Sequence, residues 1–102
     1  MSQAMGDREK ILEMRGYGNN LTEENLERIT ESLNYHDWKV RLEITKVLKK
    51  FIVDGPRKLQ EKAMKYLWTL SEDIHPVVRL CVFEIRRIKL LEEEMARLSG
   101  KT

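Results

Sequence analysis

The side chains that could bind a metal or act as a nucleophile are few in this sequence. His36 and His75 are the only histidines, and Cys81 is the only cysteine. A metal site needs three or four ligands close together, whereas each histidine stands in a turn near one aspartate, Asp37 or Asp73. Cys81 has no base next to it in the sequence that would activate its thiol. We therefore predict no metal site, no cofactor and no enzyme activity, and we interpret both histidines as polar turn residues.

Basic residues in the middle of the chain are a stronger functional signal. Residues 37–65 carry nine basic and four acidic side chains, whereas residues 7–34 carry four basic and seven acidic ones. Four lysines share one side of a predicted helix: Lys39, Lys46, Lys49 and Lys50. Positive charge at suitable spacing is enough to contact phosphates without reading bases. The alternative is an ordinary solvated lysine face, and Glu43 and Glu61 interrupt the patch.

The composition favours a single helical domain. The 102 residues are 41% hydrophobic and 35% charged, with few Gly and Pro, which is typical of a folded helical protein. The high content of Lys, Arg, Glu and Ile also points to a thermophile. A single cysteine allows no intrachain disulfide, and the sequence shows neither a signal-peptide pattern nor an apolar run of membrane-spanning length. We expect a cytoplasmic protein that makes no contact with membranes.

Apolar spacing, together with helix start and stop residues, predicts five helices. Thr22 and Asp37 are good N-cap residues, and Pro76 suits the first turn of a helix. Gly55 fits the left-handed position that often follows a helix, and Pro56 can open the next helix. This junction predicts two antiparallel helices joined by a tight turn. The predicted helices cover residues 7–15, 22–33, 37–53, 56–70 and 76–98.

The sequence repeats with a period of 38 residues. A Val-Arg pair at 40–41 recurs at 78–79, inside the matching frames 37–42 and 75–80. Apolar residues that follow the pair also recur at the same spacing in both frames. The second and third predicted helices therefore form one unit, and the fourth and fifth form another.

These frames resemble the HEAT-like repeat family, whose pattern is a turn Asp, often a Pro, and then Val-Arg opening the second helix of each unit. Residues 73–79 match this pattern, and residues 37–41 match it with Trp38 where Pro often stands. The resemblance covers residues 22–91. It implies an all-α fold of two antiparallel helical hairpins, an α-α superhelix, preceded by a short N-terminal helix.

The resemblance also sets the expected boundaries and the roles of four residues. We assign residues 1–20 to an N-terminal segment with a short capping helix, and residues 21–99 to the two-repeat domain. Terminal caps are usual in such stacks. By resemblance, four residues would cap turns and link neighbouring units by hydrogen bonds rather than bind a ligand: Asp37, Arg41, Asp73 and Arg79.

The family also implies a wider set of candidate phosphate contacts. Its second helices line a concave face, which by resemblance puts Lys46 and Lys49 on one surface with Arg86 or Arg87. Some HEAT-like proteins hold the DNA backbone in this way. The full candidate set is Lys39, Lys46, Lys49, Lys50, Arg86 and Arg87. Sequence-independent nucleic-acid binding through the basic face of the third and fourth helices is therefore one functional hypothesis.

The last predicted helix is apolar on two sides, which indicates neighbours on two sides. Val78, Val82 and Ile85 form one stripe, and Phe83 and Leu90 lie on the far side. Two repeats are also fewer than the roughly three that usually make a stable stack. We therefore predict a homo-oligomer through Phe83 and Leu90. The alternatives are that both residues pack under the N-terminal segment, or that they are singly exposed apolar residues.

The function that we predict first is a non-catalytic scaffold for protein interactions. A protein partner, including a second copy of the chain, would bind along a groove or on the last helix, which we expect to outrun the bundle beyond Lys89. No small-molecule substrate is evident. Some HEAT-like proteins are glycosylases, but none of their catalytic residues is visible in this chain. The partner and the pathway are left open by the sequence.

Overall fold

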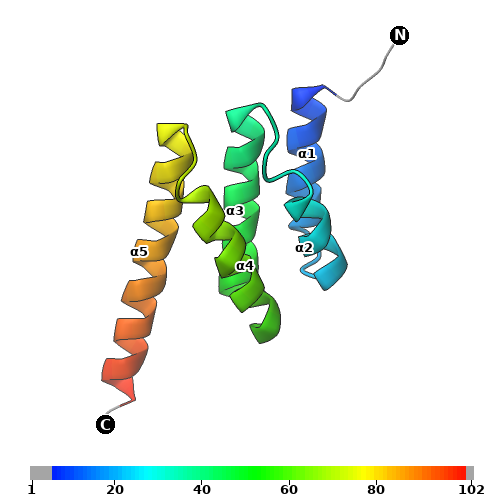
Figure 1. Cartoon of the computed structure of the whole chain (residues 1–102). Helices are drawn as coiled ribbons and strands as arrows, with labels where there is room; N and C mark the ends of the chain where they lie inside the picture. The colour runs from blue at the N-terminus through cyan, green and yellow to red at the C-terminus, as the bar shows by residue number, and fades with distance from the viewer. Residues whose placement is uncertain (1–5, 101–102) are drawn as a thin grey trace.

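A computed structural model describes residues 6–100, and this part of the chain is all-α, as the sequence predicts (Figure 1). Its helices are α1 (Asp7–Tyr17), α2 (Glu23–Thr30), α3 (Trp38–Asp54), α4 (Arg57–Leu70) and α5 (Pro76–Ser99). Two predicted boundaries are wrong. Helix α1 continues through Gly16 to Tyr17, and α2 ends at Thr30 rather than at residue 33.

Side-chain caps start three of the helices. Thr22 caps α2, and Asp37 caps α3 by accepting a hydrogen bond from the Lys39 backbone N–H at 2.9 Å. His75 does the same for α5, where its Nδ1 accepts a bond from the Val77 backbone N–H at 3.2 Å. The sequence prediction missed this cap because histidine is not among the residues that are preferred at N-cap positions. The two caps that open α3 and α5 stand at equivalent positions of the 38-residue frame.

The turn between α3 and α4 requires a residue without a side chain. Gly55 is extended, with φ −77° and ψ 168°, so the left-handed conformation expected from the sequence is wrong. Its backbone N–H donates to the Phe51 carbonyl oxygen at 3.0 Å. A Cβ at position 55 would lie 2.6 Å from that oxygen. Glycine is therefore needed for close approach rather than for its access to positive φ.

Helix α3 is the centre of the fold, because it packs against α1, α4 and α5. Helices α1, α3 and α5 lie side by side as one layer, and α2 and α4 cover one side of that layer (Figure 1). Helices α1 and α5 are the outer members of the layer. Among the described helices of the layer, only α3 has a neighbour on each side.

The apolar core surrounds α3. Every residue of the stripe predicted for the third helix is buried: Val40, Ile44, Val47, Leu48 and Phe51. The other buried apolar residues are Met14, Leu26, Ile29, Ile52, Leu59, Ala63, Leu67, Leu70, Val78, Val82 and Ile85. Burying one such side chain stabilises a fold by roughly 1.5–3 kcal/mol. The core therefore depends on α3 more than on any other described helix.

An ion pair joins α1 to α3. The Glu43 side chain is almost buried and accepts hydrogen bonds from Arg15, with Nε at 3.1 Å and Nη2 at 3.3 Å from its two oxygens. The Glu43 hydrogen bonds and charge raise the pKa of the Arg15 guanidinium. Glu43 therefore lies toward α1 and does not interrupt the lysine patch, contrary to the expectation from the sequence.

Candidate interaction surfaces

An ion pair links the start of α3 to the turn before α5. Arg41 donates to both carboxylate oxygens of Asp73, at 2.7 and 3.0 Å, and both side chains are largely buried. The Asp73 carboxylate also accepts a bond from the His75 backbone N–H at 2.9 Å. Burial opposes the charged form of Asp73, but hydrogen bonds from Arg41 and His75 outweigh it and lower the pKa of Asp73. This bidentate pair fixes the α4–α5 turn against α3.

The equivalent arginine of the second frame, Arg79, makes a bond to a carbonyl oxygen but none to a carboxylate. Arg41 donates through Nη1 to the Tyr35 carbonyl oxygen at 2.7 Å, and Arg79 donates through Nη1 to the Asp73 carbonyl oxygen at 2.7 Å. In each frame the accepting carbonyl belongs to the residue six positions before the arginine. Within residues 6–100, Arg79 has no carboxylate partner and its side chain is exposed. The structure thus groups Arg41, Asp73 and Arg79, while Asp37 caps α3 separately.

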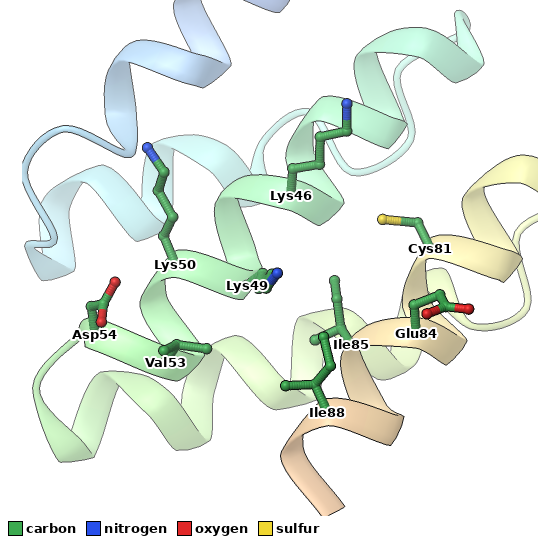
Figure 2. A pocket seen from close by; sticks show the side chains of 9 residues that line it. All are labelled: Lys46, Lys49, Lys50, Val53, Asp54, Cys81, Glu84, Ile85 and Ile88. Atoms are coloured by element: carbon green, nitrogen blue, oxygen red, sulfur yellow. The ribbon is translucent and has the colours of Figure 1, made fainter. Parts of the chain in front are cut away.

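A groove of about 460 Å³ runs between α3 and α5 (Figure 2). From α3 it is lined by Lys46, Lys49, Lys50, Val53 and Asp54, and from α5 by Cys81, Glu84, Ile85 and Ile88. In Figure 2 the lysines project from α3, while the isoleucines and Cys81 stand on the facing helix. None of the three lysines forms an ion pair within the described part of the chain. We call this surface the lysine groove; it combines an apolar floor with unpaired positive charge.

The thiol of Cys81 stands in the lysine groove without the features of a nucleophile. Burial raises the pKa of Cys81, and the charges of Lys46 and Lys49 lower it by less. A thiol of raised pKa stays protonated near neutral pH and reacts slowly. Cys81 therefore contributes apolar surface to the groove floor.

The outer face of α5 exposes large apolar side chains. Phe83 and Leu90 are 59% and 62% exposed, and Leu80 beside them is exposed as well. Phe83 and Leu90 line a shallow hollow of about 160 Å³ together with Arg86 and Arg87. The described part of the N-terminal segment packs on α3 instead, because α1 lies at the opposite end of the layer (Figure 1). We call this surface the outer face of α5.

These contacts and surfaces can be set beside known proteins. No protein-family model, curated protein or solved structure matches this chain. What the chain does must therefore be inferred from its own residues.

The six candidate phosphate contacts do not share one surface. Only Lys46, Lys49 and Lys50 meet, in the lysine groove. The Lys39 ammonium lies 6.0 Å from the ring centroid of Trp38 at the start of α3. The Arg86 guanidinium lies 3.9 Å from the ring centroid of Trp68 on α4, a cation–π contact that turns it away from the groove. Arg87 lies on the outer face of α5.

The C-terminal part of α5 has no covering helix. Every residue from Leu90 to Gly100 is exposed, so the helix outruns the bundle just beyond Lys89. Its apolar residues Leu91, Met95 and Leu98 continue the stripe that enters the groove at Ile88, at alternating spacings of three and four. We call residues 90–99 the α5 tail. Despite its length, neither α5 nor any other described helix could cross a membrane.

The two histidines lie in separate contacts. His36 Nε2 is 3.2 Å from a carboxylate oxygen of Asp7, and its ring stacks on Tyr35. His75 stacks on Trp38 with a centroid separation of 4.0 Å, in addition to capping α5. Among residues 6–100, no group of three or more His, Cys, Asp or Glu side chains is placed to hold a metal ion. Both rings thus pack in the turns that join the helices.

Proposed function

We propose that this chain is a non-catalytic scaffold of HEAT-like helical hairpins that associates with itself through the outer face of α5. The observation that carries the proposal is the difference between equivalent positions of α3 and α5. Thr45 and Ile52 of α3 are at most 1% exposed, whereas their counterparts Phe83 and Leu90 are about 60% exposed. Large apolar residues of α5 therefore stand at positions that are buried in α3 but have no covering neighbour in α5.

Covering this face with protein is energetically favourable. Removing a large apolar side chain from water contributes about 1.5–3 kcal/mol when burial is complete. A stable interface buries about 800 Å² on each partner, and a helix as long as α5 spans about 36 Å at 1.5 Å per residue. The outer face thus offers Phe83 and Leu90 as apolar anchors with Arg86 and Arg87 at the rim.

The test is the mass of the protein in solution. Phe83→Glu with Leu90→Glu should lower the mass of the oligomer in light scattering after size exclusion, because the carboxylates would be desolvated at the outer face. Leu12→Glu is the matched control, since Leu12 is similarly exposed but stands on α1. An oligomer of unchanged mass after the double substitution would mean that the outer face is not an interface. A wild-type chain that is monomeric at all concentrations would overturn self-association itself.

The lysine groove favours a second candidate function, sequence-independent binding of nucleic acid. Three unpaired ammonium groups on one surface could contact successive phosphates. Duplex DNA should then bind with an affinity that falls steeply with salt, and Lys46→Glu with Lys49→Glu should abolish binding. Lys58→Glu with Lys65→Glu makes the same charge change on α4, on exposed residues outside the groove. Equal loss in both double variants would indicate only a response to net charge.

A further inference from the structure

We propose that the lysine groove of one copy receives the α5 tail of a second copy, in a reciprocal, antiparallel pair. The inference rests on the proposed self-association, but it uses a different surface from the outer face of α5. The groove provides an apolar floor and unpaired lysines. The tail provides the two complementary features, an apolar stripe and a run of acids.

The tail has the properties of a docking helix rather than of a solvated one. Leu91, Met95 and Leu98 are 55–69% exposed and stand on one side. A helical segment of this length is marginal in water without packing. Since α5 is one continuous helix through Ser99, the tail projects away from the groove of its own chain. A groove in another copy is therefore the one that it can occupy.

Charge complementarity selects a second copy as the occupant. The tail carries Glu92, Glu93 and Glu94 and ends in a helix C-terminus, which also has partial negative charge. Glu92 and Glu94 flank the apolar stripe, whereas Glu93 turns toward the α4 side, where it lines a hollow with Lys89. The lysines of the groove outnumber its acidic residues, so an acidic helix is favoured there.

The positions of the groove and the tail along α5 set the direction of pairing. The α5 residues that line the groove end at Ile88, and the tail begins at Leu90. Only antiparallel helices bring the tail of each copy to the groove of the other. If Ile88 of one copy lies opposite Leu91 of the other, then Cys81 lies opposite Leu98. Cys81 is seven positions earlier in its helix and Leu98 is seven positions later in the other, and the two antiparallel helices run in opposite directions. The interface is isologous, so each contact occurs twice.

The deciding experiment reverses charge on each side of the contact. Lys46→Glu with Lys49→Glu makes both groove and tail acidic, and Glu92→Lys with Glu94→Lys makes both basic. Each double variant alone should associate at least about tenfold more weakly than wild type, because like charges then face each other at both contacts. A 1:1 mixture of the two should form a heterodimer, because each groove then meets a tail of opposite charge.

Controls separate this inference from simple loss of charge and from the proposed function. Glu24→Lys with Glu27→Lys makes the same charge change on exposed residues of α2, outside both the groove and the tail, and should associate like wild type. Circular dichroism should show unchanged helix content in all variants, since every substituted residue lies at the surface. Association that survives both charge reversals but is lost in Phe83→Glu with Leu90→Glu would overturn the groove pairing and leave the outer face intact. Failure of the 1:1 mixture to associate would also overturn the pairing.

A cross-link provides an independent measurement of the register. Cys81 is the only cysteine, so Leu98→Cys should give a disulfide-linked dimer under mild oxidation if positions 81 and 98 of different copies meet. Leu12→Cys, which is similarly exposed but stands on α1 outside both proposed interfaces, serves as the matched control. Equal cross-linking in both variants, or none in either, would overturn the antiparallel register.

Discussion

Helices α3 and α5 follow the same sequence frame but have different surroundings. The comparison shows which contacts come from the frame itself and which come from the neighbouring helices. Both begin at a side-chain cap. In both, the arginine of the Val-Arg pair, Arg41 or Arg79, donates a hydrogen bond to a carbonyl oxygen in the preceding turn. Helix α3 then has α1 and α5 on its two sides, whereas α5 has a described neighbour on one side only. The caps and the arginine–carbonyl bonds, which both helices have, join residues close in the sequence. The packing contacts, which differ, depend on whether another helix follows in the layer.

The first prediction compares a phenylalanine on each helix and carries the largest expected effect. Phe51 of α3 is fully buried and Phe83 of α5 is exposed. Phe51→Ala should lower the free energy of unfolding by about 3–5 kcal/mol, because it removes apolar contacts and leaves a cavity. Phe83→Ala should change it by less than about 0.5 kcal/mol in the monomer. Denaturant unfolding at low protein concentration measures both, and similar losses would mean that Phe83 is covered within its own chain.

The second prediction compares the two frame arginines. Arg41→Met should destabilise the fold by about 2–4 kcal/mol, because Asp73 would remain largely buried without its cationic partner. Arg79→Met should cost less than about 1 kcal/mol, since the exposed arginine loses a single hydrogen bond to a carbonyl. Thermal unfolding of the two variants side by side checks the order. A larger loss for Arg79 would contradict the view that the ion pair, rather than the carbonyl bond, fixes the turn.

The sequence predicts what depends on near neighbours. The α3 stripe from Val40 to Phe51 and the caps at Thr22 and Asp37 were predicted correctly, because apolar spacing and cap chemistry act within a few residues. The outrunning of α5 beyond Lys89 was also predicted, because its apolar stripe is longer than the helices that could cover it.

Long-range pairs could not be predicted in the same way. The Arg15–Glu43 pair and the stack of Arg86 on Trp68 join residues far apart in the chain. Their formation depends on how α1, α4 and α5 are rotated about their axes, and a helical wheel fixes only relative angles within one helix. A helical wheel also leaves out position along the axis, so it grouped Lys39 with the lysines of the groove although Lys39 stands seven residues before Lys46, beside Trp38 at the start of α3.

The third prediction extends the comparison of the arginines to pH. The pKa of Asp73 in the folded protein lies below its ordinary value of 3.8. The unfolded chain therefore binds a proton at higher pH than the folded protein does, and the stability due to the ionised Asp73 is lost as pH falls from about 4 through the lowered pKa. Above that window the contribution is complete and constant.

Because the pKa values of Glu13, Glu23 and Asp37 are lowered as well, the total acid dependence contains several carboxylates. The difference between wild type and Arg41→Met isolates the part that comes from the ion pair. Urea unfolding between pH 2 and pH 6 should show that this difference shrinks as the pH falls, because protonated Asp73 no longer attracts the guanidinium. Arg79→Met should show no such convergence, since Arg79 has no carboxylate partner among the described residues. A difference for Arg41→Met that stays constant with pH would mean that packing of the arginine stem, rather than its charge, holds the α4–α5 turn against α3.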